Sequence, residues 1–298
     1  MDSIHAVLQA VEQSEENSVL ATIVRVIGSS YRKEGTVSLF LESGKQVGML
    51  TAGCLEEELS SRAREMYGSE GSKLFVYDLS SETESEWGRG LGCNGQIHVV
   101  LESVKGKRRQ SLKEMKSALD SGLSVVDKKF VGDQTFIQHY DPKPRLVLFG
   151  AGADAIPVAE LAVKIGFYVI ITDWRPSYCV KESFPGAEER WVGEPHEVVP
   201  QLGLRSDDCV VVMSHVFEKD KEILYLLRDI PLHYLGVLGS KARIDKLMNG
   251  ETWLRRVRSP VGLPIGAEGP EEIAVSIAAE LILHVRRMRS QEIYRPTS

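Results

Sequence analysis

One stretch, Pro144 to Pro176, constrains the fold of this chain more than any other. It has the pattern of a buried strand, a tight glycine turn, a helix and a second buried strand. Gly150, Gly152 and Ala155 form a G-x-G-x-x-A turn before the helix, and Asp173 ends the second strand. This order of elements predicts a Rossmann-type βαβ unit with a parallel sheet.

Phosphate chemistry gives one reason for such a turn. Gly150 permits the turn, Gly152 lets the backbone approach a pyrophosphate, and the helix N-terminus offers free N–H groups. Asp173 could accept hydrogen bonds from a ribose diol, and its charge would favour NAD over NADP. The alternative is a Rossmann scaffold that keeps the turn for packing alone. Asp154 favours this alternative, because its negative charge would repel a phosphate unless it caps the helix.

Composition excludes several classes of protein. The net charge of −6 gives no basic footprint for nucleic acid or an anionic membrane. Acidic residues interrupt the N-terminal segment, which therefore lacks a signal-peptide pattern, and no apolar run approaches membrane-spanning length. The cysteines form no C-x-x-C pair, which fits reduced thiols in the cytoplasm. We therefore expect a cytoplasmic protein that binds neither nucleic acid nor membrane.

The length of 298 residues suggests about two domains. The sequence predicts a smaller mixed α+β N-terminal domain over residues 1–140, with a connecting region over 105–143. The proline pair Pro142 and Pro144 is the best linker candidate. A Rossmann-like domain with a parallel sheet follows over 144–290, with a tail at 291–298. The predicted fold class is therefore α/β.

Two glycine-rich turns of the N-terminal domain each carry a cysteine, Cys54 and Cys93. A thiolate is a soft ligand that suits molybdenum, and it can also carry a transferred sulfur. Cys54 lies before a predicted helix, a position that favours the thiolate. Small buried thiols that pack tight turns are the alternative. Cys179 and Cys209 lack such a context, and we interpret them as structural.

Other candidate residues follow glycine turns or strand ends. Arg32 and Lys33 could hold a phosphate or be an exposed basic pair. His215, with Asp220 five residues on, ends a strand of the Rossmann-like domain and could carry a proton, bind a ligand or only satisfy local hydrogen bonds. Ser240, with Lys241 and Arg243, could bind a phosphate or begin a solvated helix.

Several acidic residues have plainer interpretations. Glu56 and Glu57 could act beside Cys54, but acids in a first helical turn are more often partners of the helix dipole. Glu268, Glu271 and Glu272 are expected to cap the last helix.

Five motifs together resemble the XdhC/CoxI family of xanthine dehydrogenase accessory proteins. They are G-S-S-Y-R (Gly28–Arg32), T-A-G-C-L-E-E (Thr51–Glu57), L-G-C-N-G (Leu91–Gly95), F-G-A-G-A-D-A-I-P (Phe149–Pro157), and Tyr234–Arg243 with Pro260–Ala274. The chain departs from the family pattern at Tyr31, Ala52, Asn94 and Ala153, which bears on details of ligand binding.

The resemblance implies a two-domain chaperone that binds molybdenum cofactor (molybdopterin) and supports its sulfuration and insertion. The implied partners are an apo molybdenum hydroxylase of the xanthine dehydrogenase type and a cysteine desulfurase, and a homodimer is typical. An NAD(H)-dependent oxidoreductase and a regulator that senses NAD(P) through the Rossmann domain are the alternatives. The residues predicted to bind cofactor are Cys54, Cys93, Arg32, Gly150, Gly152, Asp173, His215 and Ser240, with both cysteines as metal ligands; no catalytic residue is predicted.

Overall fold

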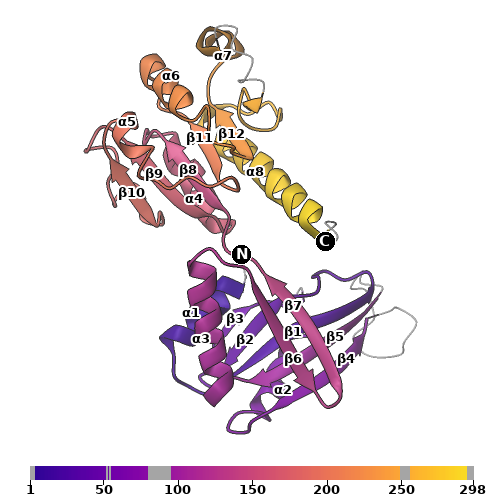
Figure 1. Cartoon of the computed structure of the whole chain (residues 1–298). Coiled ribbons are helices and arrows are strands. Elements are labelled where there is room, and N and C mark those ends of the chain that lie inside the picture. Colours follow the sequence, from indigo (N-terminus) through magenta and orange to yellow (C-terminus); the bar gives the residue numbers. More distant parts are fainter. Residues whose placement is uncertain (1–3, 52, 54, 80–94, 249–255, 294–298) are drawn as a thin grey trace. The chain divides into compact units, whose positions relative to one another are not determined.

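The computed structural model describes residues 4–51, 53, 55–79, 95–248 and 256–293. The chain forms two compact units, Met1–Lys143 (unit 1) and Pro144–Ser298 (unit 2), shown in Figure 1. Unit 1 contains an antiparallel sheet and a separate hairpin, and unit 2 contains a parallel sheet. The α/β class predicted from the sequence is confirmed.

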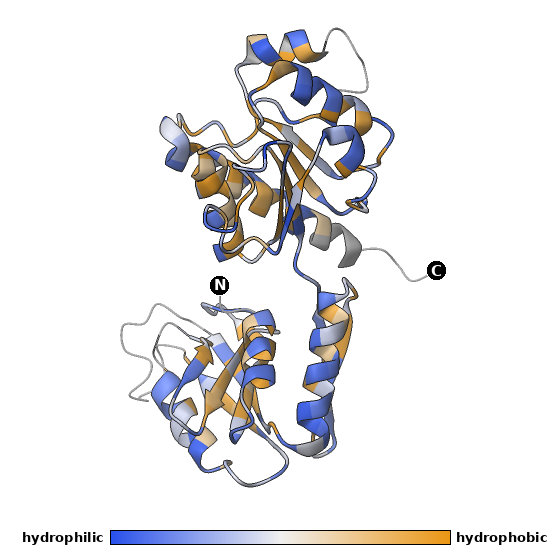
Figure 2. Cartoon of the chain, turned by 90° about the vertical axis from the view of Figure 1, so that its left-hand side faces the viewer, coloured by the Kyte–Doolittle hydropathy of each residue, from blue (hydrophilic) through white to orange (hydrophobic). Residues whose placement is uncertain are grey.

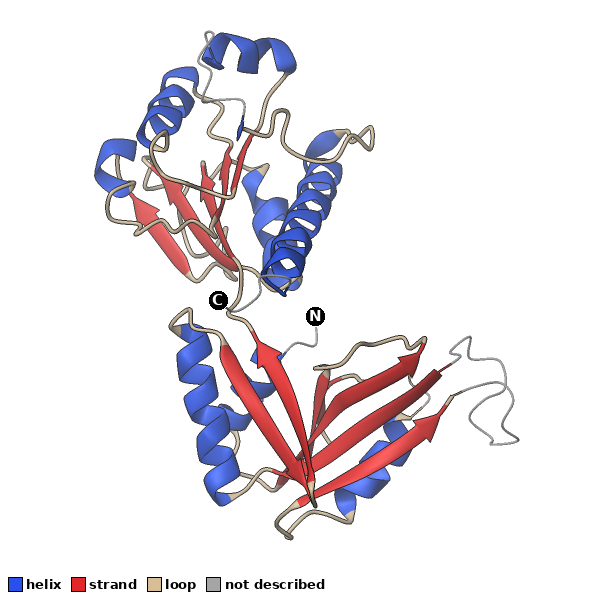
Figure 3. Cartoon of the chain, turned by 45° about the vertical axis from the view of Figure 1, so that its right-hand side comes forward, coloured by secondary structure: helices blue, strands red, loops and turns tan. Residues whose placement is uncertain are grey.

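The sheet of unit 1 has the strand order β3-β2-β1-β5-β4, and every neighbouring pair is antiparallel. Its strands are β1 (Ser18–Gly28), β2 (Val37–Leu41), β3 (Gln46–Gly48), β4 (Ser72–Asp78) and β5 (Gly95–Ser103). A register shift between Ile23 and Arg25 interrupts the pairing of β1 with β5. The separate hairpin comprises β6 (Val125–Val131) and β7 (Gln134–Tyr140), as Figure 3 shows.

Helices cover both faces of this sheet because its strands alternate apolar side chains between the two faces. Leu20 of β1 packs with α1 (Ile4–Gln13) and α3 (Gly106–Asp120). Its neighbours Val19 and Ala21 pack instead with α2 (Glu56–Arg64). The hydropathy colours of Figure 2 show the apolar residues gathered on the strands and on the inner faces of the helices.

The segment 105–143, expected as a connecting region, folds as part of unit 1. It forms α3 and the β6–β7 hairpin, and α3 packs on α1. Two arginines of this segment, Arg108 and Arg109, are half-buried. Arg109 donates hydrogen bonds to the backbone carbonyl of Val11 in the last turn of α1 and to those of Ser14 and Glu16, which follow the helix. The guanidinium therefore satisfies one carbonyl of the helix end and holds the segment that leads to β1.

A buried cluster of four charges joins this segment to the sheet. Lys129 of β6 is fully buried and pairs with Glu102 of β5 and with Asp127, the latter at 3.0 Å. Arg108 of α3 donates to both oxygens of Asp127 at 2.8 Å and to Glu102 at 3.0 Å. Burial alone would raise the pKa of Asp127, but the hydrogen bonds from Arg108 and the charge of Lys129 lower it to about 2. Two acids and two bases balance, so each charge of the cluster is paired.

Unit 2 has the strand order β10-β9-β8-β11-β12, all parallel, which is the order of a Rossmann fold. Its strands are β8 (Arg145–Phe149), β9 (Tyr168–Asp173), β10 (Glu189–Val192), β11 (Cys209–Val212) and β12 (Tyr234–Val237). Its helices are α4 (Ala155–Lys164), α5 (Pro195–Val198), α6 (Phe217–Leu226), α7 (Lys241–Met248) and α8 (Gly269–Ile293). The strand–turn–helix–strand unit of residues 144–176 forms its centre.

The central strands are apolar on both sides because helices cover both faces of the sheet. Residues of α4 and α8 pack with Leu146 and Leu148 on one face, and residues of α5, α6 and α7 pack with Val147 and Phe149 on the other. Helix α8 continues to Ile293, beyond the start of the expected tail at 291–298. The sequence offers no helix breaker there before Pro296.

The buried cluster predicts a local effect of Asp127→Asn. Losing this carboxylate leaves Lys129 and Arg108 short of one negative charge, at a cost of about 3 kcal/mol. Hydrogen exchange of β6 and β7 peptides in increasing urea should report that loss. In the wild type, the contribution of Asp127 is complete above its unfolded-state pKa and is lost as the pH falls toward 2; this dependence should be absent from the variant.

Asp120→Asn is the matched control, because Asp120 forms an exposed pair with Lys116. It should change stability by less than about 0.5 kcal/mol. Equal effects of the two substitutions would contradict a structural role for the cluster.

Candidate functional site

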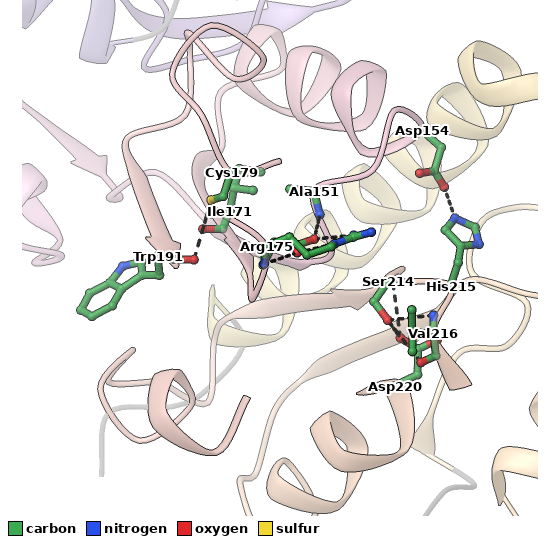
Figure 4. A network of polar contacts seen from close by, with 11 residues as sticks. Ala151, Asp154, Ile171, Arg175, Cys179, Trp191, Ser214, His215, Val216 and Asp220 are labelled. Carbon is green, nitrogen blue, oxygen red and sulfur yellow. Dashed lines mark hydrogen bonds and ion pairs between the residues drawn. The ribbon is translucent and has the colours of Figure 1, made fainter. Parts of the chain in front are cut away.

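The carboxyl ends of the unit 2 strands form the first candidate site. The strand order reverses direction between β8 and β11, so a crevice opens outside their ends. Gly150 follows β8, Asp173 ends β9, Ser214 and His215 follow β11, and Gly239 follows β12. The structure thus brings predicted site residues to one edge of the sheet, several of them visible in Figure 4.

Gly150 is required by a close approach of two strands. Its φ is +115°, and a Cβ atom there would lie 2.7 Å from backbone atoms of Met213 and Ser214. At Gly152 a Cβ would meet only a carboxylate oxygen of Asp154, at 2.8 Å, which is the end of a side chain that can move. Gly150 therefore has a packing reason that involves no phosphate.

Asp173 is buried, and internal donors occupy both of its oxygens. The backbone N–H of Ala151 donates at 2.8 Å, and Arg175 donates from its backbone and its guanidinium at 2.9 Å each. Burial alone would raise the pKa of Asp173, but these hydrogen bonds lower it below its ordinary value. A ribose diol would have to displace Arg175 to reach this carboxylate.

Aromatic rings hold Arg175 in place. Its guanidinium lies 3.8 Å from the ring centre of Tyr178 and 4.6 Å from that of Trp174. These contacts stabilise the cation and fix the side chain against Asp173. No role was predicted for Arg175, although the sequence places it two residues after Asp173 and between the aromatic residues Trp174 and Tyr178.

Asp154 pairs with His215 across the crevice. The Nε2 atom of His215 lies 2.6 Å from Oδ2 of Asp154, as Figure 4 shows. Asp154 makes no side-chain cap to α4, so the capping role considered from the sequence is wrong. Its charge still lies at the N-terminus of α4, where the helix dipole favours an anion. His215 has a φ of +63°, an uncommon conformation for a residue with a side chain.

The residue before His215, Ser214, takes part in a second set of polar contacts. Ser214 donates a side-chain hydrogen bond to the fully buried Asp220, and Arg243 pairs with the other oxygen of Asp220 at 2.7 Å. Ser240 accepts the backbone N–H of Arg243 at 3.3 Å and so caps α7. Asp220 and Arg243 therefore support the crevice from within, and Ser240 begins a helix.

The crevice contains a cleft of about 790 Å³ in unit 2. Asp154 and His215 lie on its wall, together with apolar residues of the loop that precedes α8. This volume is within the usual range for small-molecule sites. The cleft lies at the switch point, where open α/β sheets bind ligands.

The second candidate site is one edge of the unit 1 sheet. The register pairs Gly28 at the end of β1 with Gly95 at the start of β5, and pairs Ser38 near the start of β2 with Gly48 at the end of β3. The G-S-S-Y-R motif follows β1, the T-A-G-C-L-E-E motif follows β3, and the L-G-C-N-G motif leads into β5. All three motifs therefore connect to the same edge of the sheet, the one formed by the ends of β1 and β3 and the starts of β2 and β5.

Contacts at this edge show how the turns are held. A Cβ atom at Gly95 would lie 2.6 Å from the carbonyl oxygens of Ile27 and Ser29, so only glycine fits. Thr51 donates its backbone N–H to Glu56 at 2.8 Å and its hydroxyl to the same carboxylate. Glu56 thus holds its own turn, whereas Glu57 is exposed. The guanidinium of Arg32 is half-buried and lies 5.4 Å from the ring centre of Tyr31.

Cys54 and Cys93 lie outside the described residues. Both described cysteines, Cys179 and Cys209, are buried in unit 2. Burial raises the pKa of the Cys209 thiol to about 12 and also raises that of Cys179. These values agree with a structural role for this pair. Within the described ranges, no cluster of three or more His, Cys, Asp or Glu side chains could hold a metal ion. No described helix is long and apolar enough to span a membrane.

Comparisons with known proteins agree with this architecture. Residues 146–281 match the model of the XdhC Rossmann domain, and residues 11–78 match that of the XdhC and CoxI family. The chain is 38% identical to a Bacillus subtilis protein described as a probable xanthine dehydrogenase subunit, over 97% of this chain and 99% of that protein. A crystal structure from Bacillus halodurans, described as a xanthine dehydrogenase, superposes with a TM-score of 0.88 at 40% identity and covers 96% of both chains.

A more distant relative is the molybdenum cofactor insertion chaperone PaoD of Escherichia coli. It is 24% identical over 96% of this chain and 88% of its own length. The protein belongs to the XdhC/CoxI family. The family predicted from the five motifs is therefore confirmed.

The close approach at Gly95 predicts the effect of Gly95→Ala. The new methyl group would push the end of β1 away from β5 and destabilise this edge by about 2 kcal/mol or more. Hydrogen exchange of the β1 and β5 backbone should accelerate locally. Gly132→Ala is the control. Its φ of +55° strains an alanine locally, but no described atom lies within 4 Å of the new Cβ, so hydrogen exchange of β1 and β5 should not change. A Gly95 variant with unchanged exchange would contradict the packing of these two motifs.

Proposed function

We propose that this protein is an accessory protein that binds molybdenum cofactor and supports its sulfuration and insertion into a molybdenum hydroxylase of the xanthine dehydrogenase type. The observation that carries the proposal is similarity along nearly the whole chain both to PaoD and to the Bacillus subtilis protein. Insertion of a preformed cofactor leaves the pterin itself unchanged. For that step the residues of the chain need only bind the cargo, exclude water and release it, and the sulfur for sulfuration would come from another protein.

The edge of unit 1 that joins the three motifs is the proposed site for the metal end of the cofactor. Cys54 and Cys93 would supply soft thiolate ligands, or one of them would carry the sulfur. One described feature supports this assignment: Glu56 accepts hydrogen bonds from Thr51 and so holds the turn before Cys54. Arg32, half-buried in the motif that follows β1, is proposed to face the cofactor phosphate.

The proposed partners follow from this role. An apo molybdenum hydroxylase would receive the cofactor, and a cysteine desulfurase would supply the sulfur. We propose that the protein acts in the cytoplasm as a homodimer. The net charge of −6 makes an anionic membrane or nucleic acid a poor partner.

The nicotinamide alternatives find less support in the described contacts. Donors within the chain already engage both oxygens of Asp173, and Asp154 places a carboxylate beside the turn where a pyrophosphate would bind. An oxidoreductase or an NAD sensor would need both arrangements to change.

Cysteine variants test the cofactor site. The protein should be purified without oxygen from cells that make the cofactor, and its molybdenum measured by elemental mass spectrometry, with pterin measured by fluorescence after oxidation. We expect about one cofactor per wild-type chain, and a large loss in Cys54→Ala or Cys93→Ala because the metal loses a thiolate ligand.

Cys179→Ala and Cys209→Ala are matched controls, because both remove a buried thiol from unit 2. They should retain the cofactor if they fold. Cofactor retained in both unit 1 variants would remove the cysteines from the binding site, and a wild type without cofactor would refute the proposed function.

A further inference from the structure

A second, smaller pocket of unit 2 lies away from the crevice. Its volume is about 220 Å³, and among the described residues it shares only Leu263 with the lining of the larger cleft. Tyr234, which begins β12, forms part of its wall, so the pocket lies toward the amino end of that strand. The crevice lies at the carboxyl ends of the strands. The small pocket is therefore a separate feature of the fold.

Two segments bring the polar residues of this pocket together. Glu280, His284 and Arg287 follow one another at spacings of four and three residues in α8, so they share one face of the helix. Arg258 lies beside β12, because its backbone makes hydrogen bonds of 2.8 and 3.0 Å with that strand. The backbone of each charged residue in the lining is thus fixed by the sheet or by the last helix.

Donors of the chain itself engage the carboxylate of this pocket. Oε2 of Glu280 accepts hydrogen bonds from the hydroxyl of the buried Tyr234 and from the backbone N–H of Gly262, both at 2.7 Å. The ring centre of His284 lies 5.1 Å from that of Tyr234. These contacts order the wall of the pocket, and the two donors partly offset the negative charge of Glu280.

The two arginines of the pocket differ from others in unit 2. Arg175 and Arg243 each form an ion pair with an aspartate. Within the described part of the chain, the guanidiniums of Arg258 and Arg287 form no ion pair and no hydrogen bond. Two guanidiniums against a single carboxylate leave the lining with an excess of positive charge, in a chain whose net charge is −6. The pocket therefore favours an anion.

Size and charge select the class of anion. A pocket of about 220 Å³ lies below the usual range for drug-sized ligands, so it suits a small ion better than a nucleotide. Each guanidinium offers a planar fork of N–H donors that matches two oxygens of a phosphate or a carboxylate. Two such forks can neutralise a dianion and bind different pairs of its oxygens, whereas a single carboxylate would leave one fork unused.

We propose that the pocket lined by Arg258, His284 and Arg287 binds a tetrahedral dianion of the phosphate type, with the two guanidiniums as its ligands. The ion is either free inorganic phosphate or sulfate, or the terminal group of a short phosphate ester. This assignment does not depend on the proposed function, because none of these residues belongs to the edge of unit 1.

His284 gives the proposed site a dependence on pH. Burial lowers the pKa of His284, and the charges of His233 and of the two arginines lower it further, whereas Glu280 raises it. A bound dianion would offset the charges of the arginines and so raise this pKa. Anion affinity should therefore rise as the pH falls through the pKa of the bound state, and it should level off below the pKa of the free state.

Calorimetric titration of the whole protein at constant ionic strength tests the proposal with phosphate, sulfate, glycerol phosphate and malonate. We expect phosphate and sulfate to bind the wild type at one site per chain. Arg258→Gln and Arg287→Gln should each weaken phosphate binding about tenfold or more, because each removes one charged fork from the ion.

Arg286→Gln is the matched control, because Arg286 is the neighbour of Arg287 in α8 but does not line the pocket. It should change phosphate affinity by less than about twofold, since salt screens a charge outside the site. Thermal unfolding should show that all variants fold. Equal affinity in the wild type and both pocket variants would overturn the proposal. An equal loss in Arg286→Gln would also overturn it, because the attraction would then come from the general charge of the helix.

The other probes identify the ion. Tighter binding of glycerol phosphate than of phosphate would assign the site to an ester, and weaker binding would assign it to the free ion. Tighter binding of malonate than of phosphate and sulfate would overturn the choice of a tetrahedral ion.

Sulfate serves for the pH series, because its own charge stays constant there. Its affinity should rise from about pH 7.5 to about pH 5.5 in the wild type and stay nearly constant in His284→Gln. The same pH profile in both proteins would overturn the place of His284 in the site.

Discussion

The approach of β11 to the glycine turn after β8 sets the geometry of unit 2. Gly150 touches Met213 and Ser214 so closely that no side chain fits between them. This contact brings the end of β11 beside the start of α4, and it places His215 within 2.6 Å of Asp154. The polar pair at the switch point therefore depends on this approach, and Ser214 in turn contacts the Asp220–Arg243 pair. The same glycine that would serve a phosphate loop in another Rossmann protein serves strand packing here.

The second constraint on unit 2 is that arginines pair with carboxylates at the carboxyl ends of its strands. Asp173 is paired by Arg175, and Asp220 is paired by Arg243, in both cases at the end of a strand where a ligand could otherwise find a free carboxylate. Asp154 pairs with His215 in the described cleft. The chain thus keeps the Rossmann architecture while its carboxylates have different partners from those of a dinucleotide site.

Local patterns made much of the fold predictable. Continuous apolar runs such as Leu146–Phe149 identify strands buried on both faces, and Gly166 marks the end of α4. The βαβ unit and the family could be read from residues close in sequence. The pairing of Asp154 with His215 could not, because 61 residues separate them and the contact depends on the strand order. The roles of Arg108 and Arg109 could not be predicted for the same reason, because their partners lie far away in the sequence.

Transfer of the cofactor to a hydroxylase is what the proposed function requires, and it can be measured. The protein loaded with molybdenum cofactor should be mixed with a purified apo hydroxylase of the xanthine dehydrogenase type, and molybdenum should be measured in both proteins after they are separated. We expect molybdenum to leave this protein and to appear in the hydroxylase in equal amount, with activity rising in proportion. Molybdenum that stays on this protein, or a hydroxylase that is activated equally well by free cofactor alone, would contradict it.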